Sequence, residues 1–197
     1  MREEGWSIRL TPYTIYKLLN SLFLGLSIGV VFTIYEPLSP SVYSTGGVVL
    51  ALATIVVARF YGKIMTLGCF FGFSLLVEIV ILIMIVYFLW RPYSYMTAML
   101  VYIGYQTTFA FGSYLVRAET LALDNDDILS RIDSVKQIGY LCGMCLSWAA
   151  YKTMESFGIM DKHDKVYTIH WMLLGVELLI ILFLVRSFEK EPIVNGS

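Results

Sequence analysis

Long apolar runs that contain almost no charge limit this 197-residue chain to folds that a lipid bilayer can hold. Residues 64–90 include one charged side chain, Glu78, and residues 92–116 include none. Backbone amide and carbonyl groups inside a bilayer must hydrogen-bond within their own segment, so runs of about 20 such residues predict spanning helices. We predict six of them, over residues 13–35, 37–58, 64–90, 92–116, 134–151 and 166–185.

The composition agrees with a membrane protein and excludes a soluble single-domain enzyme. Hydrophobic residues make up 58% of the chain and charged residues 15%, against roughly 45–50% and 25% in soluble domains. The net charge of −1 offers no basic surface for a nucleic acid. Because the runs lack the alternation of barrel strands, we predict an all-α polytopic membrane protein rather than an outer-membrane barrel.

The basic residues indicate on which side of the membrane the chain ends lie. With the N-terminus inside, ten Lys and Arg fall in inner segments and four in outer ones, which favours cytoplasmic termini. We predict a multi-pass protein of the plasma (inner) membrane with a cytoplasmic N-terminal segment (1–12), a six-helix transmembrane domain (13–188) and a cytoplasmic tail (189–197). Lys17 is expected to snorkel to the membrane surface, and a charged cytoplasmic loop is expected over residues 117–133.

Short similarities between predicted helices indicate an internal repeat. Val-Glu-Ile at 77–79 corresponds to Val-Glu-Leu at 176–178, 99 residues further on, and the small residues at 47 and 51 correspond to those at 139 and 143. Three helices in each half, with an odd number reversing the direction, would make two inverted three-helix repeats of the kind that transporters use. The alternative is chance, because apolar helices draw on few residue types.

The fourth and fifth predicted helices, with the loop between them, resemble the first half of a major facilitator superfamily transporter. The resemblance rests on Tyr-Gln-Thr-Thr-Phe-Ala-Phe-Gly at 105–112, on the helix end at 116–119 and on the glycine spacing at 139–143. That family normally has twelve spans, so the resemblance implies half of a major facilitator-type fold. Two copies would rebuild the whole transporter.

Part of the chain departs from the family's pattern. Gly62 and Lys63 match the signature that follows the family's second helix, but Arg59 and Phe60 stand where the signature has Asp and Arg. The Arg typical of the fourth helix in proton-coupled members is missing from residues 102–106. These departures support an alternative hypothesis, a non-transporting membrane subunit or scaffold of a larger membrane complex.

Acidic residues lie in the middle of two predicted spans, where a carboxyl group is costly. Glu78 and Glu177 should each cost roughly 2.5–3.5 kcal/mol to insert, so they should face protein or a water-filled cavity. They are candidates for a proton or cation site, and the alternative is a protonated acid that bonds a neighbouring helix. Glu36, beside Pro37 at an outer helix end, is a further candidate ion or gate residue, with capping of the helix turn as its alternative.

Polar groups on the first and fourth helices form the candidate substrate path. Tyr102, Tyr105, Gln106 and Phe109 have the spacing i, i+3, i+4 and i+7, which predicts one helix face, and Asn20 adds an amide from the first helix. In the resembled family these two helices line the central cavity. The alternative is that the same groups hydrogen-bond between helices.

Small residues four apart on the fifth helix, Gly139, Gly143 and Ser147, predict close packing of helix backbones and are candidate dimer contacts. Cys142 and Cys145 have redox spacing, but their place inside a helix favours a structural role. The sequence has no metal-ligand cluster, phosphate-binding loop or catalytic triad, so we expect no metal, no cofactor and no enzymatic activity.

The function we expect is a half-size transporter that moves a small-molecule solute by alternating access as a homodimer. Its expected partners are the lipid bilayer, the solute and either a second copy or a second membrane subunit. A nucleic acid is not expected among them.

Overall fold

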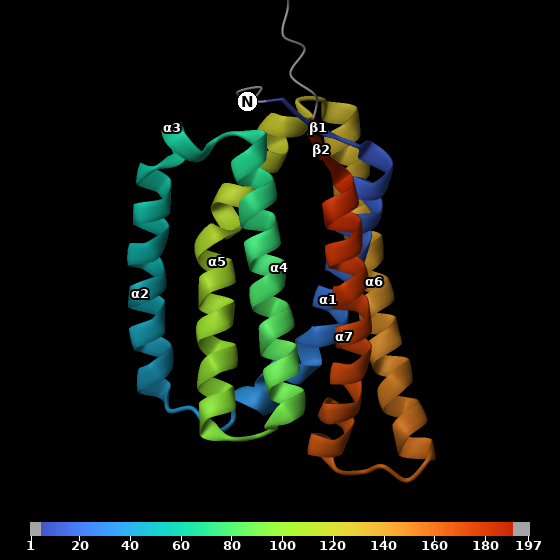
Figure 1. The fold of residues 1–197 in the computed structure, drawn as a ribbon. Helices are drawn as coiled ribbons and strands as arrows, with labels where there is room; N and C mark the ends of the chain where they lie inside the picture. Colours follow the sequence, from blue (N-terminus) through green and yellow to red (C-terminus); the bar gives the residue numbers. More distant parts are fainter. Residues whose placement is uncertain (1–4, 191–197) are drawn as a thin grey trace, which may run out of the picture.

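The computed structural model describes residues 5–190, and most of them belong to helices (Figure 1). The prediction of an all-α fold is therefore confirmed for this part of the chain. A one-turn helix, α3 (Tyr61–Ile64), and two strands, β1 (Trp6–Ile8) and β2 (Phe188–Lys190), accompany the long helices. The long helices are α1 (Leu10–Tyr35), α2 (Pro40–Arg59), α4 (Leu67–Trp90), α5 (Tyr95–Leu123), α6 (Asp126–Ser156) and α7 (Lys162–Ser187).

Within the described residues, α1, α2, α4 and α7 are long and apolar enough to cross a membrane. The chain therefore has the make-up of an integral membrane protein. α5 and α6 are longer, at 29 and 31 residues, but they hold more polar and charged side chains. The first eleven residues of α6 alone include three Asp, one Arg and one Lys. The count of six spans stays a prediction.

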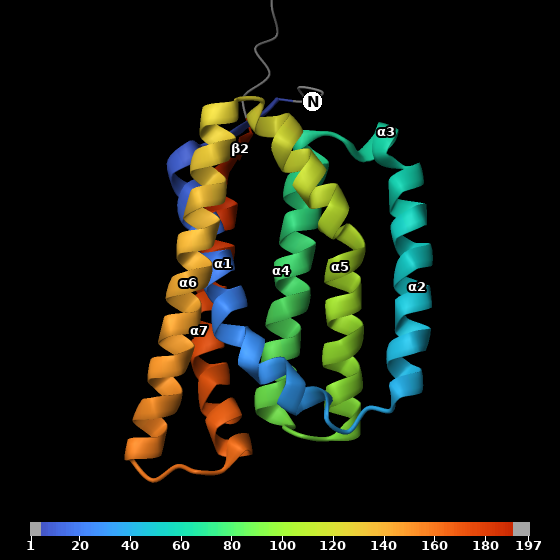
Figure 2. The same cartoon turned by 180° about the vertical axis from the view of Figure 1, so that it is seen from behind.

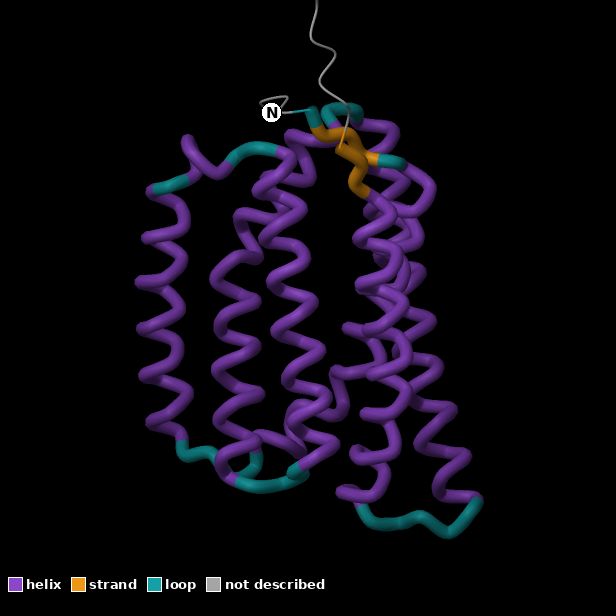
Figure 3. Tube along the Cα trace, in the orientation of Figure 1, coloured by secondary structure: helices purple, strands orange, loops and turns teal. Residues whose placement is uncertain are grey.

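An antiparallel pair of short strands ties the two ends of the described chain together, which the sequence analysis missed. Trp6 pairs with Lys190 and Ile8 with Phe188 (Figure 3). The ring of Trp6 lies 5.5 Å from that of Phe71 on α4. Each strand has three residues and no apolar pattern that would predict it. The packing of the helices that the strands flank brings the two segments together.

β1 and β2, at the two ends of the described chain, lie at one end of the bundle (Figure 1), which we call the termini end, and the opposite end is the far end. α1 begins at Leu10, so the predicted boundary after residue 12 falls inside its first turn. Residues 1–4 and 191–197 of the two predicted terminal segments lie outside the described residues.

The expectation of a loop over residues 117–133 is wrong, because most of these residues are helical. α5 continues to Leu123, and α6 begins after a link of two residues. In the link, Asp124 takes a left-handed conformation with φ 38°, and Asn125 accepts a hydrogen bond from the Ile128 amide (3.0 Å). This cap, and two Asp in the first turn, stabilise the start of α6 well before its apolar part.

The long helices pack in two groups of three that meet where α4 contacts α7 (Figure 1, Figure 2). α1 packs against α6 and α7, and α5 packs against α4 and α2. α2 has no buried residue and forms an outer edge of the bundle. Large buried side chains of the other helices fill the core, among them Tyr13, Leu26, Phe70, Phe88, Tyr114, Ile132, Ile169 and Leu184.

The glycine stripe of α6 serves a close approach to α1. A Cβ added at Gly139 would collide with the Leu18 carbonyl oxygen, and one added at Gly143 would collide with the Leu22 carbonyl oxygen. Ser147 is also buried. Small residues here let two helix backbones touch within one chain. α1 therefore covers Gly139 and Gly143, and these two residues are not available to join two copies as expected.

Candidate functional site

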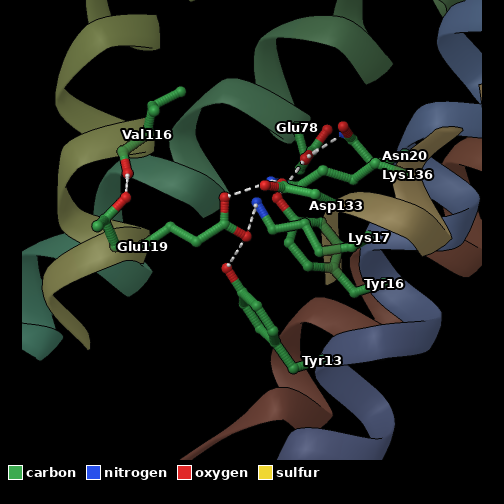
Figure 4. Close-up of polar contacts among 10 residues, drawn as sticks. Tyr13, Tyr16, Lys17, Asn20, Glu78, Val116, Glu119, Asp133 and Lys136 are labelled. Atoms are coloured by element: carbon green, nitrogen blue, oxygen red, sulfur yellow. Dashed lines mark hydrogen bonds and ion pairs between the residues drawn. The ribbon is translucent and has the colours of Figure 1, made fainter. Parts of the chain in front are cut away.

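One face of α1 carries a row of polar side chains into the interior of the bundle. Tyr13, Tyr16, Lys17 and Asn20 are spaced i, i+3, i+4 and i+7, so they follow one another along that face. Tyr13 and Tyr16 are buried, and each donates a hydrogen bond to a carboxyl group of another helix (Figure 4). The row connects the termini end, where α1 begins, with the middle of the bundle.

Glu119 of α5 lies at the outer end of this row. Its Oε1 accepts a hydrogen bond from the Tyr13 hydroxyl (2.9 Å) and lies 3.2 Å from Lys17 Nζ. Its Oε2 accepts a hydrogen bond from Lys136 Nζ of α6 (2.7 Å), which also contacts Asp133 (3.1 Å). Two lysines and two carboxylates share this cluster, so its charges balance and the buried carboxylate is compensated.

The structure places Lys17 inside the bundle, and the expectation that it snorkels to the membrane surface is wrong. Its side chain is 13% exposed. The ammonium lies beside Glu119 and over the rings of Tyr13 and Tyr16, 5.3 and 5.1 Å from their centroids. A carboxylate and two aromatic faces give the charge favourable partners where it stands, so it has no need to reach water.

Glu78 of α4 lies at the inner end of the row. It is 1% exposed, and its Oε1 accepts hydrogen bonds from the Tyr16 hydroxyl (2.9 Å) and from Asn20 Nδ2 (3.0 Å). Its Oε2 is buried and has no hydrogen-bond partner among residues 5–190. Asn20, predicted to line a substrate path, belongs to this acid site instead.

Glu177 of α7 is buried near Glu78. It is 0% exposed, and neither of its carboxyl oxygens has a hydrogen-bond partner in the described part of the chain. Glu78 is 11 residues from the start of α4 and Glu177 is 10 residues from the end of α7. At 1.5 Å per residue, both lie roughly 15–17 Å from the termini end. α4 packs against α7, and one small cavity is lined by both Ile81 and Leu173, which lie one helical turn from Glu78 and Glu177, so the two acids share this helix interface.

Two bare negative charges are not tolerable in such a place. An isolated carboxylate in a low-dielectric interior costs far more than one hydrogen bond returns, and three of the four oxygens of this pair lack a donor within the described residues. A proton on one acid removes the repulsion and needs a single oxygen, whereas a metal ion needs several oxygens around it. Glu78 and Glu177 together are therefore suited to hold a proton. We call them the acid pair.

A small cavity lies on the far-end side of the acid pair. It has a volume of about 20 Å³, enough for one water molecule. Ser27, Tyr105 and His170 line it among apolar side chains, and its wall includes residues one helical turn from Glu78 and Glu177. The cavity therefore places two hydroxyl groups and an imidazole beyond the acid pair.

A groove between α2 and α5 holds two more of the residues predicted for a path. It has a volume of about 590 Å³, and Tyr102 and Gln106 line it. The Tyr102 hydroxyl donates to the Tyr43 carbonyl oxygen (3.2 Å). Gln106 Oε1 is buried with no hydrogen-bond partner among the residues that the structure describes.

The five predicted path residues do not line a single hollow. Asn20 bonds Glu78, Tyr105 lines the small cavity, and Tyr102 and Gln106 line the groove. Phe109 is 59% exposed and lies outside both hollows. α5 has neighbours on several sides, so residues separated by one helical step contact different helices.

Glu36 lies away from the acid pair, at the far end of the bundle. Its Oε2 lies 2.6 Å from Nζ of Lys162, the first residue of α7. The hydrogen bond and the charge of Lys162 hold the pKa of the Glu36 carboxyl below its usual value. Both side chains are more than half exposed. Glu36 therefore ties the loop after α1 to α7 and is not part of the buried site.

Tyr13, Tyr16 and Glu119 were not predicted as site residues. The spacing of Tyr13, Tyr16, Lys17 and Asn20 indicates one polar helix face. Glu119 gave no comparable signal, because it lies in a segment rich in charges.

Among residues 5–190, no group of three His, Cys, Asp or Glu side chains is placed to hold a metal ion. No protein-family model, curated protein or solved structure matches this chain. The fold and the site define its class as an all-helical membrane protein with a buried acid pair, which a polar row links to the termini end.

Proposed function

We propose that the chain is half of a membrane transporter of the major facilitator type, which carries a proton on the acid pair and acts as a homodimer to move a small solute. The observation behind the proposal is the pair itself, with three carboxyl oxygens that lack partners in the described chain. Ionisable groups inside membrane helices are costly, and they commonly mark ion pathways and proton relays. An acid whose charge changes during a transport cycle is such a group.

The polar row on α1 gives the acid pair a connection to one side. Asp133, whose side chain is 71% exposed, contacts Lys136, and Lys136 contacts Glu119. From there the hydroxyls of Tyr13 and Tyr16 lead to Glu78 (Figure 4). In the proposal a proton enters from the termini end along this row, and the small cavity beyond the pair serves its release on the other side.

The helix packing supports six spans arranged as two inverted repeats. If α1, α2 and α4 correspond to α5, α6 and α7, then the contacts of α1 with α6 and α7 match those of α5 with α2 and α4. Corresponding helices run in opposite directions (Figure 1). Glu78 and Glu177 then occupy equivalent positions where α4 meets α7. Transporters of this kind bind substrate and coupling ions near the bilayer midplane, which agrees with the depth of the pair.

Exposed apolar surface on a central helix supports the second copy. Leu24, Ile28 and Phe32 form a row along α1 and are 56%, 44% and 77% exposed, although α1 packs against two long helices. In the proposal a second copy faces this row, and the solute passes between the copies. The termini end faces the cytoplasm of a cell with a plasma (inner) membrane, because most Lys and Arg lie on that side.

A non-transporting subunit or scaffold is the second candidate function. The exposed apolar residues of α1 favour it. Leu24, Ile28 and Phe32 are apolar, whereas a solute path needs polar groups that face it. In this case the row binds a different membrane protein, and the acid pair joins helices through protonated carboxyl groups.

Transport in liposomes tests the proposal. Purified protein in vesicles that contain a pH-sensitive dye should change the internal pH when the right member of a solute panel is added, and the change should saturate with solute concentration. Glu177→Gln should abolish the pH change. Glu155→Gln is the matched control, because Glu155 lies at the far end with two lysine partners.

Unsaturable solute flux that Asn20→Ala, a change at the acid pair's hydrogen-bond partner, leaves unchanged would contradict transport. The mass of the complex in nanodiscs separates the two candidates. Two copies of the chain support the homodimer, and one copy with an unrelated chain supports the scaffold.

A further inference from the structure

An open hollow lies between α3 and α5 at the termini end of the bundle. Its volume is about 540 Å³, inside the range of roughly 300–1,000 Å³ that small-molecule sites occupy. Figure 1 shows α3 beside the end of α2, at the same end of the bundle as the two strands. The residues that line the hollow are Tyr61, Gly112, Ser113, Val116 and Arg117. It therefore combines an arginine and a hydroxyl group with aromatic and apolar side chains.

The hollow lies at the level of the membrane surface. α2 is apolar enough to cross a membrane, and its 20 residues extend roughly 30 Å, the thickness of the hydrocarbon core. It ends at Arg59, and α3 begins two residues later. Tyr114 of α5 fixes α3, because its hydroxyl donates to the Ile64 carbonyl oxygen (2.8 Å) and its ring lies 6.0 Å from that of Tyr61. Arg117 follows Tyr114 by about one helical turn, so it reaches the level of α3 as well.

Three basic side chains at the hollow have no carboxylate partner. Arg59, Lys63 and Arg117 are exposed, and none of them takes part in an ion pair among residues 5–190. Arg117 lines the hollow, and Arg59 and Lys63 are each two residues from Tyr61 of its wall. Glu119, the acid nearest to Arg117 along α5, contacts two interior lysines instead. The hollow is therefore a place of excess positive charge.

The surroundings of the hollow favour an amphipathic anion over a free one. An arginine can bind phosphate oxygens through two parallel hydrogen bonds, and the exposed Ser113 hydroxyl adds a further donor. Apolar surface lies beside these polar groups. Val116 of the wall is 64% exposed, and Ile55 and Val56, one turn before the end of α2, are 63% and 56% exposed. A free phosphate makes no use of that surface, whereas the acyl chains of a phospholipid cover it.

We infer that the hollow binds the phosphate headgroup of an anionic phospholipid, with Arg117 bonding the phosphate oxygens and with Arg59 and Lys63 beside it. The acyl chains lie along the exposed apolar side of α2. Basic pockets between membrane helices bind headgroups of this kind. The site is separate from the acid pair, because neither Glu78 nor Glu177 lines the hollow, so it holds whether or not the chain moves a solute.

Photolabelling in phosphatidylcholine nanodiscs tests the inference. The probe is a phosphatidylglycerol with a diazirine on the acyl chain near the headgroup, and its matched partner is the phosphatidylcholine with the same chains, whose choline balances the phosphate charge. Phosphatidylglycerol should label α3 and residues 112–117 at least tenfold more than phosphatidylcholine does, because each nearby Lys or Arg contributes about a factor of five. Arg117→Gln should lower the labelling by phosphatidylglycerol about fivefold. Arg131→Gln is the matched control, because Arg131 is an exposed arginine of α6 that does not line the hollow.

Three outcomes would overturn the inference. Equal labelling by the two lipids in the wild type, a comparison that needs no variant, would mean that the hollow does not select an anionic headgroup. Phosphatidylglycerol labelling spread evenly over the termini end would mean that the basic residues attract anionic lipid without a defined site. Soluble glycerol 3-phosphate should leave the labelling unchanged, and its removal of the labelling would mean that the hollow binds a free phosphate compound instead of a lipid.

Discussion

Removal of the carboxylate at the outer end of the polar row should destabilise the protein measurably. Glu119→Gln keeps the shape of the side chain but leaves the ammonium of Lys17, 13% exposed, without its counter-charge. Breaking a buried ion pair costs roughly 3–5 kcal/mol. We expect the lower end, about 3 kcal/mol, because Lys136 is 27% exposed and keeps Asp133. A second substitution, Lys17→Met, removes the ammonium that Glu119→Gln leaves without a partner.

An SDS titration in mixed micelles, followed by tryptophan fluorescence, measures the free energy of unfolding of both single variants and the double variant. The double variant should lose less stability than the two single variants added together, by about 1–3 kcal/mol, because contacting residues are coupled. Glu36→Gln, at a pair whose side chains are both more than half exposed, should cost less than about 1 kcal/mol. Strict additivity of the two single effects would refute the contact between Lys17 and Glu119.

Two further predictions concern helix packing and pH. Gly143→Ala should lower the free energy of unfolding by about 1–3 kcal/mol, because the new methyl group collides with the α1 backbone; Gly72→Ala, with nothing within 4 Å, should change it by less than about 1 kcal/mol. The pair of Glu36 with Lys162 lowers the Glu36 pKa, so its stabilisation is present above the ordinary carboxyl pKa and is lost as pH falls through the lowered value. The difference in melting temperature between wild type and Lys162→Met should therefore shrink below about pH 4, and a constant difference would contradict this.

The apolar helices could be predicted because backbone groups in a bilayer must hydrogen-bond within the protein, and a long apolar segment does so as a helix. Length and charge along the predicted spans 13–35, 37–58, 64–90 and 166–185 were enough to locate four helices that could cross a membrane. The boundaries near Asp126 were not predictable from hydropathy, since capping and helix-dipole effects extend α6 through charged residues that hydropathy assigns to a loop.

The acids were predictable and their partners were not. Glu78 and Glu177 stood out because a charge in an apolar run is costly. Which helices face them depends on tertiary packing, and that packing brings Glu119 of α5 to Tyr13 of α1 across 106 positions of sequence. The strand pair could not be predicted for the same reason. Its two segments lie at opposite ends of the described chain and are brought together by the packing of the helices between them.

The α5 residues predicted for the path line different hollows. Helical spacing shows which residues lie on one side of a helix, but it does not show which other helices they contact. Tyr105 and Gln106 are adjacent in sequence and differ by one helical step. That step is enough to place Tyr105 at the interior cavity and Gln106 in the groove. The four residues do lie on one side of α5, but α5 packs against α4 and α2, so neighbouring positions on that side contact different surroundings.

Infrared difference spectroscopy at neutral pH tests most directly whether the acid pair holds a proton. A protonated carboxyl group has a C=O stretching band that an ionised one lacks. We predict that the wild type shows this band, that Glu177→Gln changes or removes it, and that Glu155→Gln leaves it unchanged. A wild-type spectrum without a protonated carboxyl band, or one that Glu177→Gln and Glu78→Gln both leave intact, would contradict the proposal that this protein carries a proton on Glu78 and Glu177.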